Sequence, residues 1–187
     1  MLSDGGVGMH LIDALLDLCN QVDRPIIAVD GPAGAGKTTL AGSIGQGFSQ
    51  RYSVRTIHMD DLYNGWDNAL GDELTHTLEK ITAAHLSGLP IPLKTYDWAT
   101  CEFREAITLE PRQLLILEGV GSGQKAVREK STALIWIEID HEIGLKRVLQ
   151  RDGAQYEAVM KRWLTSQSEY FQRDSTQENA EFILTNE

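Results

Sequence analysis

The chain has 187 residues, of which 42% are hydrophobic and 24% are charged. This length and composition suit one soluble globular domain over 1–187 and exclude a fibrous or disordered chain. The 27 acidic and 17 basic residues give a net charge of −10, which disfavours nucleic acid as a partner.

The hydrophobic runs and the cysteines indicate the cellular compartment of the protein. No apolar run approaches the length of a membrane span, and the first residues lack the basic region of a secretory signal. The two cysteines, Cys19 and Cys101, lie far apart, which indicates reduced thiols rather than a disulfide framework or a zinc site. We therefore expect a cytoplasmic protein with no membrane partner.

The pattern of apolar residues predicts helices and strands in alternation. An amphipathic helix is expected first, within 1–23, because leucines and isoleucines recur there at helical spacing. The strands are predicted at 25–29, 54–59, 113–119, 132–139 and 180–186. Further helices are predicted at 36–50 and 72–86 and, as a pair, within 141–173. Such alternation favours an α/β fold with a parallel sheet and helices on both faces.

One segment departs from this regularity. Residues 87–112 carry three of the five prolines and several aromatic residues, and no clear periodicity. Long irregular segments inside compact domains are often functional, so we expect a loop with a role in binding there.

A glycine-rich motif follows the strand predicted at 25–29. The eight residues from Gly31 to Thr38 fit the pattern G-x-x-x-x-G-K-[ST] at every position. Glycines let backbone N–H groups converge on phosphate oxygens, and the following helix adds its positive amino end. Lys37 is placed to reach the β- and γ-phosphates, and Thr38 to ligate Mg²⁺. The residues predicted to bind the triphosphate of ATP are Gly31, Ala33, Gly34, Ala35, Gly36, Lys37, Thr38 and Thr39.

Acidic residues follow two of the other predicted strands. Asp60 and Asp61 come directly after 54–59, and Glu118 lies at the end of 113–119. Ligands of open parallel sheets bind beyond the carboxyl ends of the strands, so Asp60 and Glu118 are expected near the glycine loop. Asp60 is suited to accept the proton of an attacking hydroxyl, and Glu118 to hold Mg²⁺. The alternatives are a helix-capping aspartate pair and a solvated glutamate.

Two arginines in the predicted helical pair share a helix face. Arg147 and Arg151 are four residues apart. Beside a triphosphate they would offset the charge that develops on a transferring phosphoryl group. If no triphosphate binds nearby, the two arginines would be solvated or would pair with Asp152 and Glu142.

The order of these motifs resembles that of the uridine kinases, which belong with the phosphoribulokinase and pantothenate kinase group of P-loop kinases. The resemblance covers about 24–185 and rests on "AVDGPAGAGKTTLA", "HMDDLY", "TYDW", "EAITLEPRQLLILEG" and "LKRVLQRD". It implies a three-layer P-loop fold whose five-stranded parallel sheet has the order 2-3-1-4-5, with a short helical lid at 141–173. It also implies an ATP-dependent, Mg²⁺-dependent phosphotransferase with an alcohol group as acceptor.

The resemblance also assigns roles to particular positions. Asp60 would be the catalytic base, and Glu118 the magnesium-linked carboxylate. Lys37, Arg147 and Arg151 would act on the transferring phosphoryl group. The residues that the resemblance implies for the substrate are Asp60, Tyr63, Asp67, Tyr96, Trp98 and Arg104.

The sequence departs from the uridine kinases at two places. Cys101 stands near the position of their base-reading histidine, and the segment after Arg151 lacks their R-G-R element. A nucleoside remains the expected acceptor, with another hydroxylated metabolite as the second choice.

Two other functions stay open. A nucleoside monophosphate kinase of the cytidylate type would need extra arginines for the acceptor phosphate, and Arg55, Arg104 and Arg112 are the candidates before the third strand. A non-catalytic nucleotide-binding switch would use the glycine loop alone and leave the residues expected for the acceptor without a purpose.

Overall fold

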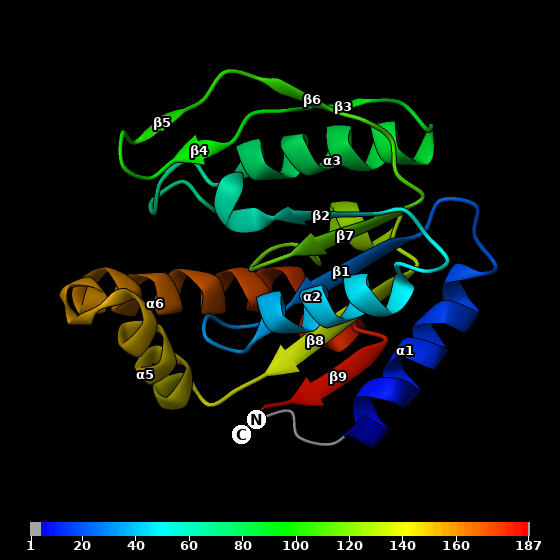
Figure 1. Ribbon diagram of the computed structural model, residues 1–187. Helices are drawn as coiled ribbons and strands as arrows, with labels where there is room; N and C mark the ends of the chain where they lie inside the picture. Colours follow the sequence, from blue (N-terminus) through cyan, green and yellow to red (C-terminus); the bar gives the residue numbers. More distant parts are fainter. Residues whose placement is uncertain (1–4, 187) are drawn as a thin grey trace.

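The computed structural model describes residues 5–186, which form one five-stranded parallel sheet with helices on both faces (Figure 1). The strands of this sheet are β1 (Ile26–Asp30), β2 (Val54–His58), β7 (Leu114–Glu118), β8 (Ala133–Glu138) and β9 (Phe182–Thr185). Their spatial order is β2-β7-β1-β8-β9. The predicted order 2-3-1-4-5 is confirmed, and each strand lies within two residues of its predicted bounds.

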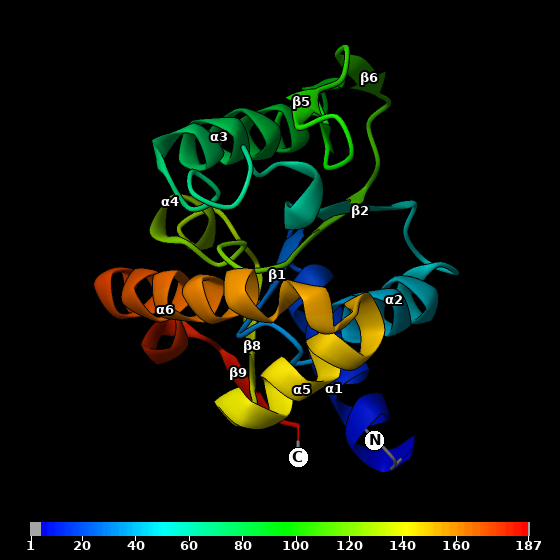
Figure 2. The same cartoon turned by 90° about the vertical axis from the view of Figure 1, so that its left-hand side faces the viewer.

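Helices occupy two layers. The α-helices are α1 (Gly5–Cys19), α2 (Lys37–Phe48), α3 (Asp72–Leu86), α4 (Lys125–Arg128), α5 (His141–Asp152) and α6 (Glu157–Asp174). Short 3₁₀ turns lie at Met59–Asp61, Ala154–Tyr156 and Gln177–Asn179. Figure 2 shows α1 and α2 on one side of the sheet, and α3, α4 and α6 on the other. Within residues 5–186, every helix is too short or too polar to cross a membrane.

The first helix ends earlier than expected. Helix α1 stops at Cys19 rather than near residue 23, where Asp23-Arg24-Pro25 leads into β1. Proline disfavours helical geometry in the residue before it, which accounts for an extended entry to the strand. Residues 1–4 of the predicted 1–23 helix lie outside the described part of the chain.

The expectation of an irregular loop at 87–112 was wrong. This segment forms two small antiparallel ladders, β3 (Ile91–Leu93) with β6 (Ile107–Leu109) and β4 (Tyr96–Asp97) with β5 (Glu102–Phe103). Strands of two or three residues are too short to show alternation in a sequence, and only their pairing reveals them. In Figure 1 these ladders lie beside α3, beyond the β2 edge of the sheet.

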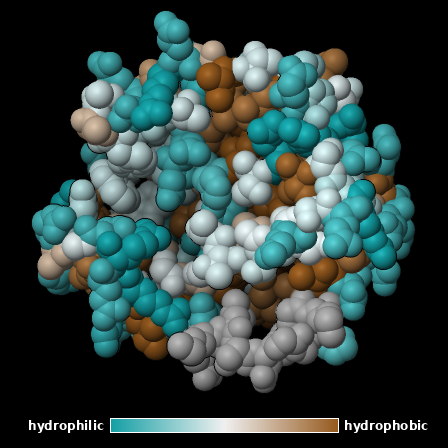
Figure 3. Space-filling model, in the orientation of Figure 1, coloured by the Kyte–Doolittle hydropathy of each residue, from teal (hydrophilic) through white to brown (hydrophobic). Residues whose placement is uncertain are grey.

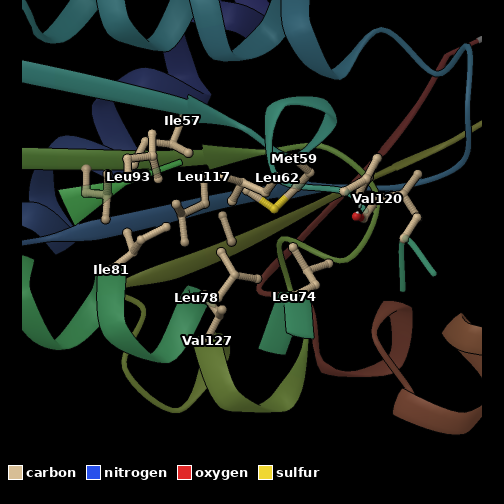
Figure 4. Close-up of a cluster of buried hydrophobic side chains, with 14 of the residues drawn as sticks. Ile57, Met59, Leu62, Leu74, Leu78, Ile81, Leu93, Leu117, Val120 and Val127 are labelled. Carbon is tan, nitrogen blue, oxygen red and sulfur yellow. Dashed lines mark hydrogen bonds between the residues drawn. The ribbon is translucent and has the colours of Figure 1, made fainter. Parts of the chain in front are cut away.

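The central strands are apolar up to the acidic residue that ends each of them, because both their faces are covered. Alternate residues of β1 enter different clusters: Ile26 and Ala28 pack toward α3, whereas Ile27 and Val29 pack toward α1 and α2. Figure 4 shows the first cluster, in which Leu74, Leu78 and Ile81 of α3 meet side chains of β2 and β7. A continuously apolar strand is what a doubly covered parallel sheet requires.

On the face shown in Figure 3, hydrophilic residues cover much of the area, with hydrophobic residues between them. Helix α5 and the start of α6 lie at the end of the sheet where the parallel strands finish (Figure 1).

Helix α5 approaches the glycine loop backbone to backbone. It is capped by Asp140, whose carboxylate accepts from the N–H groups of Glu142 at 2.9 Å and Ile143 at 3.1 Å. One turn on, Gly144 lies so close to Gly34 that a Cβ on Gly34 would stand 2.3 Å from the Gly144 carbonyl oxygen. Gly34 also has a φ of +80°, which only glycine adopts without strain. This contact sets the position of α5 over the loop.

We expect Gly34→Ala to lower the free energy of unfolding by at least about 2 kcal/mol, because the new methyl group meets backbone and the residue keeps a positive φ. Gly42→Ala is the matched control. Gly42 is an exposed residue of α2, and a Cβ there meets nothing within 4 Å. The control should gain about 0.5–1 kcal/mol from reduced backbone entropy in the unfolded chain. Urea unfolding measures both, and equal stability of Gly34→Ala and the parent would contradict this packing.

Candidate functional site

A cleft of about 290 Å³ lies at the edge of the sheet where the parallel strands end. The glycine loop, the turn after β2, the end of β7 and the helices α5 and α6 all contribute to its lining. Strand register explains the convergence: Glu118 is paired with Val29 on one side and with His58 on the other. The residues that finish β1, β2 and β7 are therefore neighbours in space.

The glycine loop forms one end of the cleft. Gly36 has a φ of +94° and precedes Lys37, the first residue of α2, so the amino end of that helix faces the loop. The Lys37 side chain is nearly buried and its Nζ donates to the Pro32 carbonyl at 2.8 Å. Burial lowers the pKa of this amine, although Asp30 and other nearby carboxylates act in the opposite direction. Among the residues predicted for the triphosphate, those that line the cleft are Ala33, Gly34, Gly36, Lys37, Thr38 and Thr39.

The other two predicted loop residues do not line the cleft. Ala35 is fully buried against the α1–α2 side of the core, and its carbonyl accepts from the Asn186 side chain at 2.7 Å. A Cβ on Gly31 would lie 2.3 Å from the Ile137 carbonyl, so Gly31 packs against β8. In addition, the Ala33 N–H donates to the buried Gln167 of α6 at 3.1 Å. The loop is thus held by groups that come from three distant parts of the chain.

A buried carboxylate ties the glycine loop to the loop after β7. Asp30 is fully buried at the end of β1 and accepts from the N–H groups of Gly31 at 2.7 Å, Gly123 at 2.8 Å and Gly121 at 3.1 Å. Burial raises the pKa of this carboxyl to about 6, against the effect of the same hydrogen bonds and of Lys37. Asp30 therefore connects both phosphate-side loops through one side chain.

Glu118 joins the loop threonine to a histidine that the sequence did not single out. The Thr38 hydroxyl donates to Glu118 Oε1 at 3.0 Å, and Glu118 Oε2 lies 2.5 Å from Nδ1 of His58. Glu118 is 5% exposed, whereas the His58 side chain is 44% exposed. Both carboxylate oxygens are thus held in place, next to the glycine loop.

Asp60 stands in the middle of the cleft lining, directly after β2. Asp60 is exposed to solvent, but it is exposed only toward the cleft, where the surrounding protein limits its hydration. This desolvation raises the pKa of the Asp60 carboxyl, and the positive charge of Lys37 opposes the rise. Asp60 thus lies within electrostatic reach of Lys37, Glu118 and Arg151.

Both predicted arginines of α5 line the cleft together with the glycine loop. The exposed guanidinium of Arg151 makes two hydrogen bonds to Asp152, from Nε at 2.7 Å and from a terminal nitrogen at 2.8 Å. Asp152 also lines the cleft. Arg147 is partly buried one turn earlier on the same helix face.

The residues that the resemblance implied for the substrate divide into two groups. Tyr63 and Trp98 line the cleft with Asp60. Tyr96, Asp67 and Arg104 do not. Tyr96 packs edge-on against Trp98 with ring centroids 5.1 Å apart, and Arg104 pairs with Asp97 at 2.9 Å across the β4–β5 hairpin. Asp67 is exposed in the loop before α3.

Four further residues of the site were missed by sequence reasoning: Asp30, His58, Trp66 and Trp163. An acidic residue that ends an apolar strand just before a glycine loop was a usable signal for Asp30. His58 could have been noted because it lies two residues before Asp60. Trp66 stands next to Asp67 in a "GWD" stretch that resembles an aromatic-Asp pair of the uridine kinases, and this was a usable signal. Trp163 gave no local signal, because it lies on a regular amphipathic helix and reaches the cleft only through the packing of α6.

The fold and the loop together define the class. A parallel sheet in the order β2-β7-β1-β8-β9, with a G-x-x-x-x-G-K-[ST] loop between its central strand and the next helix, is the P-loop NTPase fold. The five-stranded sheet and its order agree with the fold that the resemblance implied.

Solved structures with this fold include proteins described as kinases. A possible uridine kinase from Bacillus stearothermophilus is 20% identical, with a TM-score of 0.61 over 94% of this chain and 100% of that chain. A candidate fructose transport system kinase from Silicibacter sp. TM1040 is 15% identical, with a TM-score of 0.73 over 96% and 98%. The circularly permuted P-loop kinase candidate YFH7 of Saccharomyces cerevisiae is 12% identical, with a TM-score of 0.60 over 96% and 99%. No protein-family model matches the chain, and no curated protein matches its sequence.

Titration of Asp30 should be visible in stability. From pH 4 to about pH 6 the unfolded chain, with an ordinary pKa of 3.8, releases this proton while the folded protein retains it. The stability that Asp30 contributes therefore falls as pH rises through this window, by about 3 kcal/mol for a shift of about two pKa units. The free energy of unfolding of the parent, minus that of Asp30→Asn, should drop by this amount between pH 4 and pH 7.

Asp97→Asn provides a control of opposite sign. Hydrogen bonds from the Ala99 N–H and from Arg104 lower the pKa of Asp97. The stability that Asp97 contributes is therefore lost as pH falls, so the parent-minus-variant difference should rise with pH in the acid range. A parent-minus-variant difference for Asp30→Asn that does not change between pH 4 and pH 7 would contradict the raised pKa of the buried Asp30 carboxyl.

Proposed function

We propose that the protein is an ATP-dependent kinase that phosphorylates a hydroxyl group of a small molecule, with a nucleoside as the leading acceptor. The observation that carries the proposal is the placement of a phosphate-loop lysine, an acid with a raised pKa and two arginines in the lining of one cleft. Lys37, Asp60, Arg147 and Arg151 are the four side chains concerned. In phosphoryl transfer, catalysis comes mainly from positioning and charge neutralisation, and these are the groups it requires.

The proposed reaction is an in-line transfer. The acceptor hydroxyl loses its proton to the Asp60 carboxylate as its oxygen bonds to the γ-phosphorus. The bond between that phosphorus and the oxygen bridging to the β-phosphate breaks, and ADP leaves with the bonding electrons. Lys37 and the α5 arginines offset the negative charge on the transferring group. A base works best when its pKa lies near the working pH, and desolvation shifts the Asp60 carboxyl in that direction.

The residues at the loop fit a magnesium ion. Thr38 Oγ1 and Glu118 Oε1 are 3.0 Å apart, and hydroxyl and carboxylate oxygens are the ligands that Mg²⁺ prefers. Thr38 would hold the ion directly, and Glu118 would hold it directly or through water. A bound Mg²⁺ supplies charge neutralisation on the β- and γ-phosphates.

A nucleoside monophosphate kinase is less well supported. Arg55, Arg104 and Arg112, the arginines considered for an acceptor phosphate, lie outside the cleft lining. Arg55 donates to the Glu110 carbonyl, and Arg104 pairs with Asp97. Arg112 precedes β7, at the opposite end of that strand from Glu118. An acceptor phosphate would have to compete for the α5 arginines that serve the triphosphate.

Acceptor-dependent ADP release tests the kinase proposal. A coupled assay over nucleosides, nucleoside monophosphates, sugars and vitamins should find transfer to an unphosphorylated hydroxyl compound. Asp60→Asn should reduce kcat at least about 100-fold, because general base catalysis contributes that much, and leave the KM for ATP within a few-fold. Lys37→Ala is the control that removes the phosphate contact. Transfer at the parental rate by Asp60→Asn, or ADP release that no acceptor stimulates, would overturn the proposal.

His58 is expected to act on magnesium through Glu118. Without its hydrogen bond, Glu118 gains rotational freedom, and loss of such outer-shell partners weakens metal sites by about 10-fold or more. Titration calorimetry should show that His58→Ala lowers the affinity for ATP in the presence of Mg²⁺ by about this factor and leaves the Mg²⁺-free affinity unchanged. His58→Gln keeps an N–H donor and should recover most of the loss. Equal losses with and without Mg²⁺ would show that His58 supports only the fold.

A further inference from the structure

The last turn of α5 carries an arginine and an aspartate that are neighbours in the sequence, and their side chains are paired. Arg151 donates to Asp152 from Nε at 2.7 Å and from a terminal nitrogen at 2.8 Å, one bond to each carboxylate oxygen. Side chains one residue apart do not face each other along a continuing helix. Asp152 is the last residue of α5, and Gly153 leaves the helix with a φ of +109°. The end of the helix therefore allows this pair to form.

The pair contributes little to folding. The Arg151 side chain is 68% exposed and the Asp152 side chain is 37% exposed. Exposed ion pairs add little stability, because solvent screens the charges and because two flexible side chains must be ordered. Both residues nevertheless line the cleft. Their place there is better explained by a role in the site than by a role in stability.

The Asp152 carboxylate occupies only one edge of the guanidinium. A guanidinium carries five N–H groups, and the pair with Asp152 uses two of them. Among residues 10–186, no other group is hydrogen-bonded to Arg151. The edge between the two terminal nitrogens keeps two parallel N–H groups, which is the geometry that binds two oxygens of a phosphate. Asp152 thus fixes the plane of the guanidinium and leaves its phosphate-binding edge open.

The charge of Arg151 acts on the groups expected around the transferring phosphoryl group. Arg151 lies within electrostatic reach of Asp60 and Glu118. It also adds to the lowering of the Lys37 pKa, of which burial is the larger cause. Lys37, Asp60 and Glu118 all line the same cleft as Arg151. The guanidinium is therefore near enough to act on a phosphoryl group that passes between them.

We propose that Asp152 is a positioning residue for phosphoryl transfer, which holds the Arg151 guanidinium so that its open edge meets the transferring group. The inference rests on the proposed kinase function. An arginine that is already oriented loses little rotamer freedom when it binds, so more of its attraction for the developing charge is available to the reaction. Without the carboxylate, the exposed side chain of Arg151 would have to be ordered in every catalytic cycle.

The opposite role would have the opposite effect on the reaction. A carboxylate at the edge of the cleft repels a triphosphate, and it could also compete with phosphate for Arg151. If Asp152 acted in either of these ways, its neutralisation would raise the affinity for ATP or the rate of transfer. The positioning role predicts a loss of rate instead. The sign of the change therefore separates the two roles.

Substitution of Asp152 by its amide makes this comparison at nearly constant size. Asp152→Asn should lower the kcat of acceptor-dependent ADP release about 10-fold and leave the KM for ATP within about 3-fold, because the oriented edge acts mainly in the transition state. Asp152→Glu keeps the carboxylate and should recover most of the rate. Glu157→Gln is the matched control, since Glu157 is in an exposed pair with Lys161 outside the cleft lining. It should change neither constant. A higher kcat or a lower KM in Asp152→Asn would overturn the positioning role.

A double-mutant cycle shows whether Asp152 acts through Arg151. Arg151→Lys keeps the positive charge, but an ammonium group cannot be held by two parallel hydrogen bonds. In the Arg151→Lys background, Asp152→Asn should therefore cause little further loss of kcat. A full 10-fold loss in both backgrounds would overturn the inference.

Binding of a transition-state mimic separates this inference from the kinase proposal. Mg²⁺, ADP and aluminium fluoride together imitate the transferring phosphoryl group beside ADP. Calorimetry should show that Asp152→Asn weakens binding of this mimic about 10-fold and leaves the affinity for ADP with Mg²⁺ within about 3-fold. Unchanged binding of the mimic would overturn the inference, even in a protein that transfers phosphate. Binding that depends on Asp152, in a protein that transfers phosphate to no acceptor, would overturn the kinase proposal instead.

Discussion

The buried carboxylate of Asp30 holds together the edge of the sheet that carries the cleft. It lies at the end of the central strand, out of contact with water, and receives N–H groups from the glycine loop and from the loop after β7. A carboxylate in such a place is costly unless its oxygens are hydrogen-bonded, so the two loops must adopt the one arrangement that satisfies it. The rest of the cleft is built on those loops.

From this anchor, the strand register determines which side chains meet. Glu118 ends β7 between β1 and β2, which brings it to Thr38 on one side and to His58 on the other. Asp60 follows β2 by two residues and enters the same space. The glycine-loop end of the cleft is thus formed by three adjacent strand ends. Among its residues, Lys37 and Glu118 are buried, whereas Thr38 and Asp60 are open to the cleft.

The other end of the cleft, which we propose for the acceptor, is built differently. Its wall comes from a loop, a short hairpin and the helix α6, none of which belongs to the central sheet. Helix α5 is fixed over the glycine loop by the Gly34–Gly144 contact, and α6 is tied to the same loop by Gln167. The two helices that lie over the glycine loop therefore also line the rest of the cleft, through Arg147 and Arg151 of α5 and Trp163 of α6. Segments outside the sheet can vary in sequence without disturbing the phosphate site, which is how one fold serves many acceptors.

The strand order was expected from the resemblance of the motifs to the uridine kinases, and the structure confirms it. The sequence by itself determined the fold class and the glycine-loop motif, through local signals: apolar runs in the strands, glycines that permit positive φ, and polar residues at strand ends. It did not predict the two small ladders in 87–112, where strands of two or three residues carry no periodicity. Nor did it separate Tyr63 and Trp98, which line the cleft, from Tyr96, Asp67 and Arg104, which do not. Only the tertiary structure decided where the two ladders form, which of these side chains line the cleft, and that Trp163 joins them. The reason is that contacts between residues far apart in the chain depend on how helices and hairpins pack, and not on any pattern within them.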